Sequence, residues 1–246
     1  MNKEAVQRLR TIATWTGPLY AIVLFTGWGL VAGMILPPWD PKDGPTQVAA
    51  SYDGDIGRIR VGMLLLMLSA LFAMTFTAAI CDRLRDLEGR TGILCWTCGL
   101  GGAGLMCLTF YPAIFWLVAA FRPDRSPELT QLLNDLAWLQ FIGGVTIFLA
   151  LPIAVMAASF LDERPDPVFP RWFGYYSLWT MLLVIPDQLL FFFHSGPFAW
   201  NGLFGLWLPA VSFGTWFFVM FVVLRRAESP LSVPMEVPLG MMVRSE

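Results

Sequence analysis

Histidine is almost absent from this sequence, since His194 is the only one in 246 residues. A bis-histidine haem needs two histidines on facing helices, and a di-iron hydroxylase needs a cluster of them. Zinc proteases of the HExxH type also need a pair. These classes of membrane enzyme are therefore excluded, and we expect no metal site and no other cofactor.

Charged residues are scarce as well, at 14% of the chain, whereas soluble domains contain about 25%. Hydrophobic residues make up 57% and are gathered in long runs, which does not fit a large soluble core. The formal net charge of −2 gives no reason to expect a nucleic-acid partner. This composition predicts an all-α fold of the polytopic membrane class.

Motifs for covalent or phosphate chemistry are missing too. The chain has neither a GxSxG nucleophile elbow nor a GxxxxGK[ST] phosphate loop. Its four cysteines are Cys81, Cys95, Cys98 and Cys107. Cys95 and Cys98 have the CxxC spacing of redox sites, but there is no second pair to relay electrons. We therefore interpret the cysteines as small packing residues.

What the chain does contain is six apolar runs, each long enough to cross a bilayer, which takes roughly 20 helical residues. Segments that combine charged residues with proline or glycine separate these apolar runs. The predicted spans are residues 12–36, 60–81, 92–120, 133–160, 172–193 and 202–224. Together they form one transmembrane domain over residues 1–226, a single six-helix bundle. We expect the proline-punctuated residues 227–246 to be a flexible cytoplasmic tail.

The distribution of lysine and arginine predicts the orientation. If both termini are cytoplasmic, eleven of these residues lie inside and five outside. Cytoplasmic loops of membrane proteins carry such an excess. We therefore expect both termini in the cytoplasm of a multi-pass cell-membrane protein, in the bacterial inner membrane.

Small residues and prolines indicate how the spans meet. The run GLGGAG at residues 99–104 lets helix backbones approach closely. Pro112, Pro152, Pro186 and Pro209 are predicted to break the last four spans, because proline cannot donate the backbone hydrogen bond of a helix interior.

Asp187 is the most informative polar residue, because it interrupts an apolar run in the fifth span. At 100° per residue, Tyr176, Thr180, Asp187 and His194 fall within about 40° of one another, and Gln188 is adjacent. A charge at membrane depth costs at least ~2.5–3.5 kcal/mol on insertion scales. We therefore predict that this stripe faces the bundle interior. A purely structural hydrogen bond from Asp187 to a neighbouring helix is the plainer alternative.

A second polar group lies at the start of the fourth span and in the outer half of the third. It consists of Asn134, Asp135, Trp138 and Tyr111. We expect these residues to meet the stripe at an outer-leaflet chamber, with Trp39 and Trp200 at its rim. A helix cap is the plainer interpretation of Asn134 and Asp135.

A carboxyl group removed from water favours its neutral form, which can donate a proton. We therefore assign Asp187 and Asp135 as candidate acid–base catalysts. The candidate ligand-binding residues are Tyr111, Asn134, Trp138, Tyr176, Thr180, Gln188 and His194.

The leading hypothesis is a protein whose outer-leaflet-facing pocket binds an apolar small molecule, such as a lipid, an isoprenoid or a steroid-like compound. Whether it also transforms this molecule by acid–base chemistry stays open, so enzyme activity is undecided. The first alternative is a non-catalytic subunit of a membrane complex, and the second is a secondary transporter. The expected partners are membrane lipid, the small molecule, and another membrane protein or a second copy of the chain.

Overall fold

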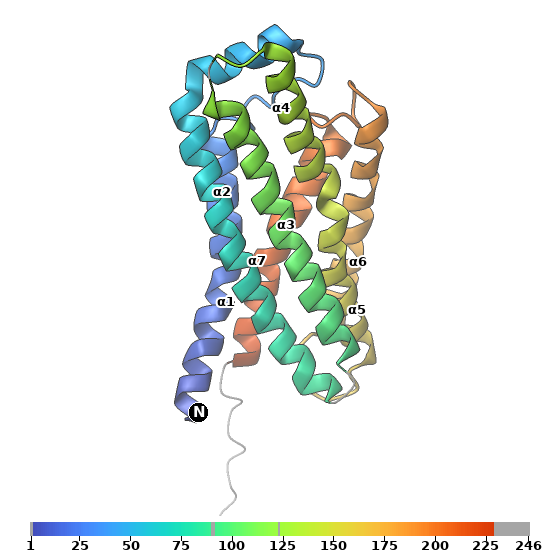
Figure 1. Cartoon of the computed structure of the whole chain (residues 1–246). Coiled ribbons are helices and arrows are strands. Elements are labelled where there is room, and N and C mark those ends of the chain that lie inside the picture. Colours follow the sequence, from blue (N-terminus) through green and yellow to red (C-terminus); the bar gives the residue numbers. More distant parts are fainter. Residues whose placement is uncertain (1, 90–91, 123, 229–246) are drawn as a thin grey trace, which may run out of the picture.

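The computed structural model describes residues 2–89, 92–122 and 124–228. The fold is 82% helix, and the described residues form no strand. The helices run antiparallel to one another and make one elongated bundle (Figure 1). The prediction of an all-helical chain is confirmed.

Six helical segments follow one another, and four of them are built from more than one piece. The pieces marked η depart from α-helical geometry: η1 and η4 are π-helical, whereas η2 and η3 are 3-10 helices. The bounds are α1 Lys3–Phe25 with η1 Thr26–Val31; α2 Pro45–Glu88; α3 Ile93–Phe121; α4 Pro127–Phe141 with η2 Gly143–Leu149 and α5 Ala150–Leu161; α6 Arg171–Val184 with η3 Ile185–Phe192; and η4 Leu203–Trp207 with α7 Leu208–Glu228.

Five of these segments are long and apolar enough to cross a membrane, which supports a multi-pass membrane protein. The segment α1–η1 is not among the five, because threonine, glycine, tryptophan and proline interrupt its apolar run. The predicted tail lies outside the described residues, apart from Ala227 and Glu228, which end α7. Arg90 and Arg244, two of the eleven residues counted on the cytoplasmic side, also lie outside the described residues.

Two helical segments have bounds that differ from the approximate spans predicted above. The second span was expected at 60–81, but α2 is 44 residues long, and its first part lies across the end of the bundle (Figure 1). It bends at Asp55, whose φ of −133° and ψ of 23° are not helical. The first helical segment ends at Val31 instead of residue 36, because Gly33 takes a left-handed φ of 70° and Pro37 follows.

Three of the four prolines expected to break helices do so. Pro152, Pro186 and Pro209 each lie in the first turn of a new helical piece, where the missing N–H is no loss. Pro112, by contrast, lies inside α3, which runs unbroken from Ile93 to Phe121. The prediction of a break there is therefore wrong.

Glycines allow the helices to pack closely, as the GLGGAG run indicated. A methyl group added to Gly102 would overlap the side chain of Thr77 on α2. Where η1 crosses α2, a methyl on Gly27 would lie 2.7 Å from the carbonyl oxygen of Gly62. These contacts bring α1, α2 and α3 close enough for backbone-to-backbone packing.

We name one end of the bundle the base; it contains the N-terminal start of α1 and the ends of α2 and α5 (Figure 1). We name the opposite end the top. Arg10 of α1 pairs with Asp82 at 2.7 Å and with Asp86 at 3.2 Å, both on α2. Ion pairs and hydrogen bonds thus join the helix ends at the base.

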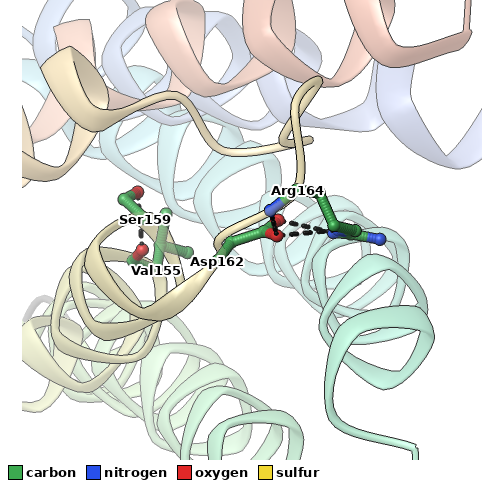
Figure 2. A network of polar contacts seen from close by, with 4 residues as sticks. All are labelled: Val155, Ser159, Asp162 and Arg164. Carbon is green, nitrogen blue, oxygen red and sulfur yellow. Dashed lines mark hydrogen bonds and ion pairs between the residues drawn. The ribbon is translucent and has the colours of Figure 1, made fainter.

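Asp162 and Arg164 form the most enclosed ion pair at the base (Figure 2). The Asp162 side chain is only 1% exposed, and Arg164 donates to it from Nε at 2.8 Å and from Nη2 at 2.6 Å. The backbone N–H of Arg164 also donates, at 3.1 Å. These hydrogen bonds hold the pKa of Asp162 below its ordinary value, against the opposing effect of burial.

The ion pair predicts a pH dependence of stability. Because the folded-state pKa of Asp162 is lowered, the pair contributes stability above about pH 4 that is lost as the pH falls through the folded-state pKa. Arg164→Gln should remove this contribution. We expect the Tm of the wild type to fall more steeply than that of Arg164→Gln below about pH 4, measured by thermal unfolding in detergent. Arg171→Gln, at an exposed position, is the control, and parallel curves for wild type and Arg164→Gln would contradict the assignment.

Candidate functional site

Asp187 lies in η3 directly after Pro186, and it is fully buried, with 0% of its surface exposed. Within the described part of the chain, neither of its carboxyl oxygens has a hydrogen-bond partner. The amide of Gln188 is near enough to interact with it electrostatically. That amide, however, donates to the carbonyl of Gly143 at 2.7 Å, and no hydrogen bond of acceptable geometry joins it to the carboxyl.

An unpaired group of this kind weakens a fold. A buried polar group without a partner costs about 1–3 kcal/mol, and an ionised carboxylate costs several kcal/mol. The plainer interpretation of Asp187, a hydrogen bond to a neighbouring helix, finds no support among the described residues. Asp187 is therefore a candidate for a role other than stability.

The predicted polar stripe exists only in part. Thr180 is buried, but its hydroxyl donates to the carbonyl of Tyr176 in its own helix. The hydroxyl of Tyr176 donates to Thr215 of α7 at 3.0 Å, and His194 is exposed beyond the end of η3 at Phe192. The single stripe is wrong because a 3-10 helix turns about 120° per residue, and because the helix ends before His194.

The polar residues at the start of α4 do meet other segments at the top. Asn134 is buried, and its side-chain oxygen accepts a hydrogen bond from Tyr52 of α2 at 3.1 Å. Asp135 is partly exposed and near enough to His194 for an electrostatic interaction. This hydrogen bond joins α2 to α4. Because the side-chain oxygen of Asn134 already accepts from Tyr52, Asn134 is less suited to ligand contact.

Tryptophan rings fill the region where the sequence predicted an outer-leaflet chamber. Trp138 is stacked on Trp200, with ring centroids 5.8 Å apart and planes 9° apart. Its other neighbours are Trp28 at 5.7 Å and Trp116 at 5.6 Å, both edge-on. Trp200 donates its indole N–H to the carbonyl of Trp39 at 3.0 Å. The predicted rim residues and the predicted ligand residue Trp138 thus pack against one another.

Two other predicted ligand residues do not join this group. Tyr111 is 46% exposed on α3, and its ring contacts Phe110 of the same helix. Gln188, as described above, satisfies the carbonyl of Gly143. That carbonyl lies at the start of η2, where the α-helical hydrogen-bond pattern changes.

A cavity of about 40 Å³ lies between α1, α3, the α4–η2 junction, η4 and α7. None of the predicted site residues is among the residues that line it. Of the lining residues only Phe25 and Ala210 are partly exposed, one on α1 and one on α7. The cavity therefore opens where these two helices pack together. Its lining residues are Tyr20, Leu24, Phe25, Trp28, Leu108, Thr109, Phe141, Ile142, Val145, Leu206, Pro209, Ala210 and Phe213.

Tyr20 and Trp28 are the functional candidates that the sequence analysis missed. Both are buried, and neither the Tyr20 hydroxyl nor the Trp28 indole N–H has a partner among the residues described. The signal was present in the sequence, because Tyr20, Leu24 and Trp28 are spaced i, i+4 and i+8 on one helix face.

The helix η3, which carries Asp187, packs against two elements that line the cavity. Val145 of η2 and Leu206 of η4 line the cavity, and η2 and η4 are both in contact with η3, which carries Asp187. Asp187 itself does not line it. The buried acid thus belongs to the packing layer next to the cavity.

No cysteine is among the described residues that line the cavity. Cys81 donates its thiol to the backbone carbonyl of Cys95 at 3.3 Å, which joins the end of α2 to the start of α3. Cys98 is buried beside them, and all four cysteines are free thiols. Their contacts agree with a packing role.

No known protein family, curated protein or solved structure matches the chain. In the described ranges, no group of three or more His, Cys, Asp or Glu side chains could hold a metal ion. The features that point to a function are the cavity, the unpaired donors of Tyr20 and Trp28, and the buried acid Asp187.

The adjacent residues Asp187 and Gln188 should respond to substitution in opposite ways. Asp187→Val replaces an unpaired buried carboxyl with an apolar group of similar size, so we expect a Tm equal to or above that of the wild type. Gln188→Leu leaves the Gly143 carbonyl without its donor and should cost about 1–3 kcal/mol. Thermal unfolding of the purified variants in detergent measures both changes. A large loss of stability in Asp187→Val would show that the carboxyl has a structural partner.

Proposed function

We propose that this protein is a six-span membrane protein that binds an apolar small molecule in the cavity between α1, α3, η2 and α7. The observation that carries the proposal is the cavity itself, whose wall is almost entirely apolar and which opens between two helices. A soluble substrate would have no route to such an opening, whereas a molecule dissolved in the bilayer would reach it directly.

The segment α1–η1 supplies the sixth span in this proposal. It packs along α2 and α7 and reaches from the base to the top of the bundle (Figure 1). The excess of lysine and arginine, eleven against five, supports placing both termini and the base on the cytoplasmic side. The cavity then lies in the half of the bundle nearer the outer leaflet.

This topology can be tested by labelling single cysteines with a membrane-impermeant maleimide, in a variant that lacks the four native cysteines. Asp40→Cys, at the top, should be labelled in intact cells, and Lys3→Cys, at the base, only after permeabilisation. Asp124→Cys is the control for the top. If Lys3→Cys were labelled in intact cells together with Asp40→Cys, α1–η1 would not be a span.

The size of the cavity limits what it holds. One water molecule needs roughly 10–15 Å³ by a comparable measure, so a cavity of about 40 Å³ takes a group of only a few heavy atoms. Pockets for complete drug-sized ligands measure about 300–1,000 Å³. We therefore propose that one end of the molecule enters the cavity, and that the rest leaves past Phe25 and Ala210 into the lipid.

The proposal concerns binding and not conversion. Neither Asp187 nor Asp135, the two acids that the sequence offered as catalysts, lines the cavity. Asp135 is at the top beside His194, and Asp187 is one packing layer away.

Filling the cavity should abolish binding. Ala210→Phe places a large ring at its mouth, whereas Val211→Phe places the same ring on the adjacent, 60% exposed position of α7. Mass spectrometry of small molecules extracted from the purified proteins should find a compound retained by wild type and Val211→Phe and lost from Ala210→Phe. Equal retention by all three proteins would show that the compound binds elsewhere, and the proposal would then fail.

A further inference from the structure

We infer that the molecule bound in this cavity carries a neutral carbonyl-type oxygen at its buried end, which accepts hydrogen bonds from Tyr20 and Trp28. This inference rests on the proposed function and adds the chemical class of the ligand. It follows from the unpaired donors of two residues that line the cavity and from the absence of charged residues among the described lining residues.

Tyr20 and Trp28 provide the donors. Tyr20 is 0% exposed and Trp28 is 1% exposed, and both line the cavity. Their hydroxyl and indole N–H groups have no acceptor in the described parts of the chain. Buried tyrosine and tryptophan usually find a partner for these groups. Trp116 and Trp138 are also unpaired, but they do not line the cavity. Two unpaired donors on residues of one cavity wall therefore point to an acceptor on the ligand.

The remaining wall decides what kind of acceptor fits. Thr109 is the other polar lining residue, and its hydroxyl donates to carbonyls of its own helix, at Leu105 and Met106. None of the described lining residues is a lysine, an arginine or a histidine. A carboxylate or phosphate would lose its hydration there without gaining an opposite charge, so the acceptor is a neutral oxygen such as that of a ketone, an ester or a quinone.

A matched pair of probes tests this chemistry on the full-length protein in detergent. 2-Octanone carries a carbonyl oxygen, and 2-methyl-1-octene has the same shape with a methylene group in its place. We expect the ketone to bind the wild type on the order of fivefold more tightly than the alkene, the effect of one net hydrogen bond. The infrared carbonyl stretch of ¹³C-labelled 2-octanone should move to lower frequency on binding.

Variants assign the donors. Tyr20→Phe and Trp28→Phe should each reduce the preference for the ketone, and together they should abolish it and the infrared shift. Tyr175→Phe, on an exposed position of α6, is the control and should behave as the wild type. The infrared shift in the wild type does not depend on how stably the variants fold.

The outcomes separate the two proposals. If ketone and alkene bind the wild type equally and the infrared band does not move, the acceptor inference is overturned while the cavity remains a binding site. If neither probe binds the wild type, the proposed function is overturned as well. A preference for the ketone that survives in the double variant would mean that other groups supply the donors.

Discussion

Every backbone amide and carbonyl at membrane depth must find its partner inside the protein, and the rest of this structure depends on that constraint. Regular helices meet it within a single segment. Four of the six segments here are irregular, and their departures from α-helical geometry lie where neighbouring segments are in contact. Gln188 shows how such a break is accommodated, because its amide donates to the carbonyl of Gly143 on the adjacent segment.

Some buried side-chain groups, unlike the backbone, are left without a partner. Asp187, Tyr20 and Trp28 are buried polar side chains with no partner among the described residues. All three lie in or beside the half of the bundle that contains the helix breaks and the cavity. The indole N–H groups of Trp116 and Trp138 are unpaired as well, and they lie in the ring cluster at the top. What sets the region of Tyr20 and Trp28 apart is therefore that their unpaired groups belong to residues of a cavity wall.

The two ends of the bundle are stabilised in different ways. At the base, the ion pair of Arg10 with Asp82 joins α1 to α2, and the pair of Asp162 with Arg164 stabilises the loop that follows α5 (Figure 2). At the top, stacked and edge-on rings around Trp138 do so. Aromatic packing of this kind leaves little open space, and the cavity lies below it, towards the middle of the bundle.

The sequence by itself determined the all-helical fold and the approximate positions of the helices, because the length of an apolar run and the turn residues that end it are local properties. It did not determine the polar stripe on the fifth span, since that prediction assumed regular helical rotation through Pro186 to His194. The cavity was also beyond its reach, although Tyr20 and Trp28 share a helix face that the sequence already displays. Which face meets which neighbour depends on how the helices cross and where each one changes its twist, and only the tertiary structure decides that.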